Sequence, residues 1–201
     1  MEPLVPGKYY HIYNRGNNRE DLFRNNDNYL HFLKLYDKYI IPVAETYAWC
    51  LMRNHFHLLI KVKVLEKLDL TGFGNLSGLN KPENFLSQQF SNLFKAYSKA
   101  YNKKFNRTGS LFQRPFRRKL VDSEAYFKNL VQYIHTNPVH HGFTTNFKDY
   151  SWSSYGSILS MKPTKLKRNT VLGWFDGNAN FIALHETKQD FENIKHIIIE
   201  D

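Results

Sequence analysis

Several features that would place the chain in a familiar class are missing from its 201 residues. Cys50 is the only cysteine, which excludes an internal disulfide and a zinc site built from cysteines. No apolar run in the sequence approaches the roughly 20 residues that cross a membrane. Residues 1–6 have neither a basic start nor an apolar segment, so we expect no signal peptide. These absences favour a reducing compartment, and we expect a cytoplasmic protein.

Acidic residues are missing from one long stretch. Between Asn84 and Val121 there is no Asp or Glu, although nine basic residues lie there, and the net charge of the chain is +10. A local basic patch is typical of proteins that bind a phosphate polymer. A solvated helix face is the competing interpretation, but such faces usually mix both signs. We therefore expect a nucleic acid partner rather than a membrane. The side chains expected to contact phosphate are Lys95, Lys99, Arg114, Arg117 and Arg118, together with Arg15.

The chain contains a single His-x-His triplet, His55-Phe56-His57. The surrounding run is typical of a β-strand, in which successive side chains point to opposite faces. The apolar residues that alternate from Phe56 to Val62 then face a core, and both histidines face the other way, about 6.6 Å apart. Two imidazoles at that separation can bind one metal ion. The alternative is a pair of half-exposed strand histidines. In either case both point away from the expected core, so Ala substitutions should leave the fold intact.

Hydrophobic periodicity predicts a βαββαβα order of elements. Strands are expected over 8–15, 43–52, 53–62 and 111–121, and helices over 26–39, 82–104 and 122–136. This order fits an antiparallel sheet covered by helices, an α+β fold. Residues 66–82 have a loop-like composition. We expect residues 1–158 to form one domain, and residues 159–201 to form a C-terminal tail that packs on it or contacts DNA, with a weak helix near Asn180.

Tyr133 and Asn137 are four residues apart on the last expected helix, which places them on one face about 6 Å apart. A tyrosine hydroxyl can attack a phosphodiester, and a divalent ion can stabilise the charge on the phosphoryl oxygens. Two imidazoles and an amide oxygen suit Mg²⁺ or Mn²⁺, although nitrogen ligands also bind Zn²⁺. The structural interpretations compete with this one. Tyr133 is then a half-buried helix aromatic, and Asn137 is the cap that ends the helix before Pro138.

Five segments together resemble a known family. They are His55-Phe56-His57, Tyr133-Ile-His-Thr-Asn137-Pro138, Gly109-Ser-Leu-Phe-Gln-Arg-Pro-Phe-Arg-Arg118, His11-Ile-Tyr-Asn-Arg-Gly16 and Ser151-Trp-Ser-Ser-Tyr155. In them the chain is similar to the single-tyrosine HUH transposases of the insertion-sequence-200-like group, particularly the REP-associated tyrosine transposases. The similarity spans about residues 9–155. The combination of motifs is specific, whereas each motif alone is not.

The resemblance implies an HUH nuclease fold, a ferredoxin-like or RRM-like antiparallel sheet with the histidines on a central strand. It implies that His55, His57 and Asn137 bind Mg²⁺ or Mn²⁺ and that Tyr133 is the nucleophile. The implied reaction cleaves and rejoins single-stranded DNA near a REP-like or insertion-sequence hairpin, through a 5′-phosphotyrosine and a free 3′-OH. Such a protein would be associated with the nucleoid. Whether its site lies within one chain or across a homodimer stays open.

Two other functions remain alternatives. An RRM-like binding module would stack bases on Tyr9, Tyr10 or Phe56, without metal and without cleavage. A zinc hydrolase would use the same histidines to activate water and would not need Tyr133. A covalent adduct on Tyr133 separates the transposase from both.

Overall fold

The computed structural model describes residues 3–64 and 82–187, and the expected loop over 66–82 therefore lies outside the described residues except for Pro82. The elements are β1 (Tyr9–Arg15), α1 (Asn26–Tyr39), β2 (Ala44–Met52), β3 (His55–Val62), α2 (Pro82–Lys104), β4 (Arg117–Val121), α3 (Glu124–His140), α4 (Tyr155–Leu159), α5 (Arg168–Trp174) and α6 (Asn178–Glu186). Short 3₁₀ helices lie at Asn17–Arg19 (η1) and Phe147–Asp149 (η3). None of the helices within the described ranges has the length and apolar character that a membrane crossing requires.

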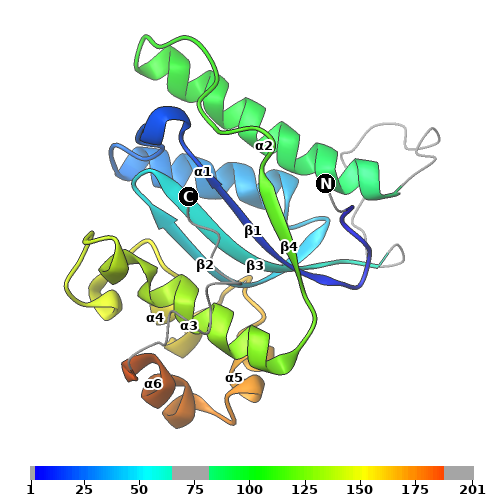
Figure 1. The fold of residues 1–201 in the computed structure, drawn as a ribbon, viewed down its shortest axis with the longest axis vertical. Coiled ribbons are helices and arrows are strands. Elements are labelled where there is room, and N and C mark those ends of the chain that lie inside the picture. Colours follow the sequence, from blue (N-terminus) through cyan, green and yellow to red (C-terminus); the bar gives the residue numbers. More distant parts are fainter. Residues whose placement is uncertain (1–2, 65–81, 188–201) are drawn as a thin grey trace.

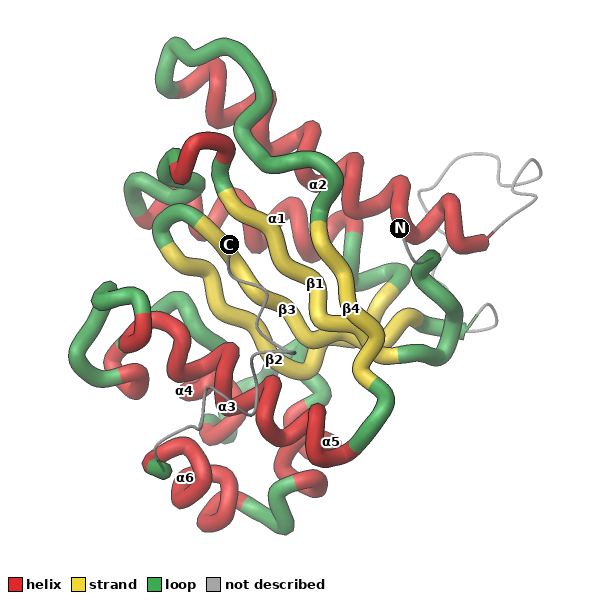
Figure 2. Tube along the Cα trace, viewed as in Figure 1, coloured by secondary structure: helices red, strands yellow, loops and turns green. Residues whose placement is uncertain are grey.

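The strands form one antiparallel sheet in the order β2-β3-β1-β4 (Figure 2). With α1 and α2 this is the arrangement of a ferredoxin-like βαββαβ unit. The expected α+β class, with helices packed on an antiparallel sheet, is therefore confirmed. β3 is a central strand, paired with β2 on one side and β1 on the other. The β1–β3 register places Tyr13 opposite His57 and Arg15 opposite His55.

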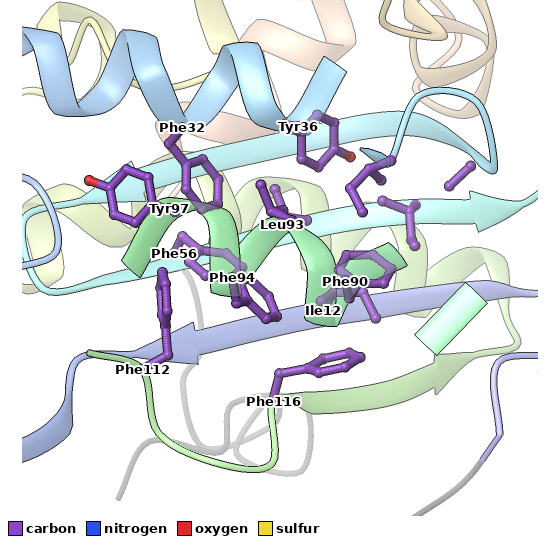
Figure 3. Packing of buried hydrophobic residues seen from close by; sticks show 14 of the residues in the cluster. Ile12, Phe32, Tyr36, Phe56, Phe90, Leu93, Phe94, Tyr97, Phe112 and Phe116 are labelled. Atoms are coloured by element: carbon purple, nitrogen blue, oxygen red, sulfur yellow. The ribbon is translucent and has the colours of Figure 1, made fainter. Parts of the chain in front are cut away.

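One face of the sheet forms a hydrophobic core with α1 and α2 (Figure 3). The alternating residues of β3 expected to face a core all do so. They are Phe56, Leu58, Ile60 and Val62, each at most 1% exposed. Burying a side chain of this kind contributes roughly 1.5–3 kcal/mol to folding. The core face of β3 thus anchors the strand, and its opposite face is left for polar groups.

The two helices on this face begin and end close to where the sequence predicts. α1 is capped by Asn25, one residue earlier than expected, and the Asn25 side chain accepts a hydrogen bond from the backbone N–H of Asn28. α2 has the predicted bounds. Its predicted apolar stripe is buried throughout and consists of Leu86, Phe90, Leu93, Phe94, Tyr97 and Tyr101. Long helices with an unbroken apolar stripe are well determined by their own sequence.

The opposite face of the sheet, which carries His55 and His57, is covered by α3 (Figure 1). His55 is 7% exposed and His57 is 3% exposed, so the interpretation as half-exposed strand histidines is wrong. The reason is that the sheet has a helical layer on both faces. An Ala substitution at His57 would therefore open a cavity between β3 and α3, which destabilises a fold.

The segment after residue 158 is packed against α3 as far as residue 187. Val171, Phe175 and Phe181 belong to the same buried cluster as Leu130 and Ile134 of α3. The weak helix expected near residue 180 is α6. The domain boundary at residue 158 stays a prediction, but α5 and α6 clearly contribute to the second core.

The largest differences from the predicted element boundaries are two, both beside a proline. α3 continues past Pro138 to His140, so Asn137 does not cap it. Pro138 lacks an N–H, but its carbonyl accepts from the Phe143 N–H, which closes the last turn. β4 begins at Arg117 instead of residue 111, because Pro115 cannot donate to a ladder.

Candidate active site

β3 and α3 each bring two polar side chains to the space between them. A strand advances about 3.3 Å per residue and a helix about 1.5 Å, so residues two apart in a strand match residues four apart in a helix. His57 accordingly lies against Tyr133, and His55 lies against Asn137. The structure therefore brings together the four residues that the sequence singled out as nucleophile and metal ligands.

His55 is held by its neighbour in the sequence. Its Nδ1 atom lies 2.6 Å from Asn54 Oδ1, an oxygen that only accepts hydrogen bonds, so Nδ1 carries a proton. The Nε2 atom of a neutral His55 is then an acceptor, and it lies 3.4 Å from a second acceptor, Asn137 Oδ1. Two acceptors at this distance repel each other unless a proton or a cation lies between them. Asn137 is completely buried.

His57 is held by a residue that sequence reasoning did not single out. Its Nδ1 atom lies 2.9 Å from Nε2 of His11 on the neighbouring strand β1. The two rings are stacked, with centroids 5.1 Å apart, and both side chains are buried. Within the described part of the chain, His57 Nε2 has no hydrogen-bond partner. A buried nitrogen of this kind is costly unless something binds it.

Burial keeps both of these imidazoles neutral. Desolvation, with a smaller contribution from Lys119, lowers the pKa of His11 to about 3. Desolvation, together with the neighbouring histidines, lowers the pKa of His57 well below its ordinary value. Near pH 7 each ring therefore retains one lone pair for a hydrogen bond or a metal ion.

The ring of Tyr133 packs against those of His57 and His11. Its ring centroid lies 5.3 Å from that of His57 and 6.3 Å from that of His11, both in edge-to-face contacts. Only 2% of Tyr133 is exposed. It is therefore more buried than the half-buried helix aromatic that the sequence offered as the alternative to a nucleophile. The side chain adjoins the histidines but is not presented to solvent.

The nitrogen and oxygen atoms that face this space suit a small divalent cation as ligands. His57 Nε2 lacks a partner among the described residues, and His55 Nε2 and Asn137 Oδ1 face each other as acceptors. Neighbouring ligands of one Mg²⁺ or Mn²⁺ lie about 3 Å apart, close to this spacing. In residues 3–64 and 82–187, no three His, Cys, Asp or Glu side chains converge as a metal site, whereas the amide oxygen of Asn137 faces His55 Nε2. Hydrogen bonds at both Nδ1 atoms are the usual means of orienting metal-binding histidines.

A pocket of about 290 Å³ opens beside the histidines. Arg15 and Arg117, two of the expected phosphate contacts, line it with His55 and His57. No carboxylate of the described residues lines it. His141 also lines the pocket, with its ring centroid 4.6 Å from that of His55, and it is a second residue that sequence reasoning did not single out.

A larger groove, of about 850 Å³, lies between α2 and residues 109–118. Lys95, Arg114 and Arg118 line it, whereas Lys99 lines neither hollow. Asn14 and Gln113 line both the groove and the pocket. The two hollows are therefore adjacent on one surface, and five of the six expected phosphate contacts border them.

Ion pairing divides the basic stretch into two groups. Lys104 pairs with Asp27 at 2.9 Å, and Arg107 pairs with Glu20, so these cations are already paired within the protein. Lys95, Lys99 and Arg114 form no ion pair with any carboxylate of the described residues. Two of the cations that border the groove, Lys95 and Arg114, are thus left for an external anion.

The sequence matches no protein-family model and no curated protein. A solved structure of a REP-associated tyrosine transposase bound to a REP hairpin has the same fold, with a TM-score of 0.58. The two sequences are 17% identical over an alignment that covers 81% of this chain and 87% of that chain. Similarity at this level establishes the fold, and the chemistry has to be argued from the site.

Proposed function

We propose that this protein is a metal-dependent transposase or endonuclease that acts on single-stranded DNA through a tyrosine nucleophile. The observation that carries the proposal is the placement of Tyr133 and Asn137 on α3 against His57 and His55 on β3. A nucleophile and a set of metal ligands are the two parts that phosphoryl transfer to a tyrosine requires. The shared fold with a REP-associated tyrosine transposase supports the same reaction.

In this proposal Tyr133 attacks a phosphodiester of the bound strand. The Oη–P bond forms as the P–O3′ bond breaks, which leaves a 5′-phosphotyrosine on one product and a free 3′-OH on the other. The tyrosine loses one proton and the departing 3′-oxygen gains one. Rejoining is the reverse attack by a 3′-OH. No ATP is required, because the phosphotyrosine retains the phosphodiester bond energy.

The remaining residues of the site take supporting roles. His55, His57 and Asn137 would hold Mg²⁺ or Mn²⁺, which when bound supplies positive charge for the phosphoryl oxygens. Arg15 and Arg117 line the same pocket and would bind the phosphates beside the scissile one. Since only 2% of Tyr133 is exposed, its side chain has to turn toward the pocket when DNA binds.

The pocket and the groove together suit a strand that continues into a hairpin. The pocket is small, which favours unpaired nucleotides. The adjacent groove is about three times larger and has Lys95, Arg114 and Arg118 in its wall, which suits the phosphates of a folded stem. The similar solved protein is bound to a REP hairpin, and a hairpin of that kind is the substrate that we propose here.

The burial of Tyr133 favours one alternative, a binding protein without catalysis. That protein would use the same basic surface, but not the base-stacking residues expected from the sequence. Tyr10 is 1% exposed and Phe56 is not exposed, because both belong to the core under α1 and α2. Tyr9 packs against Tyr47 and Phe127. A zinc hydrolase is less well supported, since no carboxylate of the described residues lines the pocket to act as a base.

One experiment separates these functions. Labelled single-stranded DNA hairpins with randomised flanks are incubated with Mn²⁺ and with wild type, Tyr133→Phe or the matched control Tyr126→Phe, which changes a tyrosine two turns away on α3. We expect a cleaved strand and a denaturant-resistant adduct from wild type and from the control, and neither from Tyr133→Phe. Cleavage by Tyr133→Phe without an adduct would establish a hydrolase. Binding without cleavage by all three proteins would establish a binding module.

A further inference from the structure

The Nδ1 atoms of His55 and His57 face groups of different kinds. His55 Nδ1 faces Asn54 Oδ1, which can only accept a hydrogen bond. His57 Nδ1 faces the Nε2 atom of His11 at 2.9 Å. An imidazole nitrogen donates or accepts according to where the ring carries its proton. The proton position on His57 is therefore linked to the proton position on His11, whereas that on His55 is set by an amide oxygen.

Two arrangements of the His11–His57 pair satisfy the hydrogen bond between them. In one, His57 Nδ1 donates to His11 Nε2, and His57 Nε2 keeps a lone pair. In the other, His11 Nε2 donates to His57 Nδ1, and His57 Nε2 carries the proton and cannot bind a metal ion. Both arrangements leave His11 Nδ1 and His57 Nε2 without a hydrogen-bond partner among the described residues. A cation at His57 Nε2 is compatible with the first arrangement alone.

We propose that His11 is a positioning residue for the metal site: by accepting the Nδ1 proton of His57, it makes His57 Nε2 available as a ligand. This inference rests on the proposed metal-dependent function. It also gives His11 a role that packing alone does not require. In the β1–β3 ladder His11 pairs with Leu59, two positions along from the Tyr13–His57 pair, so the side chains of His11 and His57 are on the same face of the sheet. An apolar residue of similar volume would fill that space equally well.

The test compares two substitutions at His11 that differ in hydrogen bonding. His11→Gln keeps a neutral acceptor, because the amide oxygen can take the place of the imidazole Nε2. His11→Phe keeps an aromatic ring but has no acceptor. Mn²⁺ alone is titrated into each full-length protein and followed by electron paramagnetic resonance. We expect His11→Phe to bind Mn²⁺ about 10–100-fold more weakly than wild type, and His11→Gln to recover most of that loss. Equal affinities for the two variants would overturn the inference, as would a wild type that binds no Mn²⁺.

A double-mutant cycle tests whether His11 acts through His57. In a His57→Gln background, His11→Phe should cause no further loss of Mn²⁺ affinity. An undiminished further loss would mean that His11 stabilises the fold in general, and the inference would fail. Thermal unfolding of each variant shows whether weak binding reflects a damaged fold, and His11→Gln supplies the comparison if His11→Phe is unstable. If wild type cleaves DNA only with Mn²⁺ present but His11→Phe binds Mn²⁺ as tightly as wild type, only the inference is refuted. Mn²⁺ binding that depends on His11, in a protein that forms no adduct, would refute only the proposed function.

Discussion

The Oδ1 atom of Asn137 lies 3.4 Å from the Nε2 atom of His55, although 82 residues separate the two in the chain. If a divalent cation lies between them, then the charge at position 137 should control its affinity. We expect Asn137→Asp to bind Mn²⁺ more tightly than wild type, because a carboxylate is a better ligand for a hard cation. We expect Asn137→Leu to bind it more weakly. Asn129→Asp, which adds the same charge two turns earlier on α3, is the control. Unchanged affinity in Asn137→Leu would remove Asn137 from the ligand set.

Metal removal should separate cleavage from DNA binding. With excess chelator we expect no cleavage by wild type, and no cleavage by His55→Gln or His57→Gln even with Mn²⁺ present. Gln is preferred to Ala here, because both histidines are buried under α3 and truncation would leave a cavity. DNA affinity, measured by fluorescence anisotropy, should change little, since the basic groove lies outside the histidine cluster. Cleavage that persists in chelator would contradict the metal role.

Charge reversal in the groove should weaken DNA binding and should make the affinity less dependent on salt concentration. Each phosphate contact releases condensed counterions, so the logarithm of affinity falls linearly with the logarithm of salt concentration. We expect Lys95→Glu and Arg114→Glu each to reduce that slope by about 1 and to weaken all DNA sequences alike. Lys34→Glu makes the same charge change on α1, at an exposed residue that borders neither hollow, and serves as the control. Identical slopes for all three variants would show that the groove does not bind phosphate.

Acid should unfold the protein through its buried histidines. His135 Nδ1 lies 2.9 Å from His185 Nε2, and both rings are buried in the second core. Burial lowers the pKa of His135 well below its ordinary value and that of His185 to about 4. Below an unfolded pKa near 6.5 the unfolded chain binds protons that the folded chain does not. Stability is therefore lost as pH falls from about 6.5 toward 4, by up to about 1.4 kcal/mol per pH unit for each histidine.

Urea unfolding at pH 7.5, 6.0 and 5.0, in chelator, measures this loss. His135→Gln removes one titrating group, so its free energy of unfolding should depend less steeply on pH, whatever its stability at pH 7.5. An equally steep dependence in that variant would show that His135 is protonated in the folded protein or that other groups dominate. The slope is the informative quantity because it does not depend on how well the amide packs.

The parts of the fold that the sequence predicts well are those with strong local patterns. The 3.6-residue apolar repeat of α2 predicts that helix and its buried stripe. The apolar residues at every second position of β3 from Phe56 to Val62 predict a strand and its core face. The same alternation places His55 and His57 on the other face. The sequence could not show that this face is covered, because that depends on α3 packing across the sheet about 70 residues later in the chain.

His11 and His141 were missed for the same physical reason. His11 begins one of the five segments that resemble the family, but nothing within its own strand distinguishes it from a structural histidine. Its contact with His57 depends on the register of β1 against β3, in which Tyr13 and not His11 lies directly opposite His57. His141 reaches the pocket because α3 continues past Pro138, where a proline normally predicts the end of a helix. Strand register and the continuation of a helix through proline are tertiary properties.

The order of strands in the sheet has a consequence for synthesis of the protein on the ribosome. β1 is made first, yet it occupies an interior position between β3 and β4. His11 can meet His57 once β3 has emerged, whereas Tyr133 and Asn137 belong to a helix that follows the last strand. A nascent chain, or one truncated before α3, would therefore carry imidazoles and basic residues but no tyrosine nucleophile. In the proposed reaction, the ability to cut DNA would arise only in chains whose sheet is already complete.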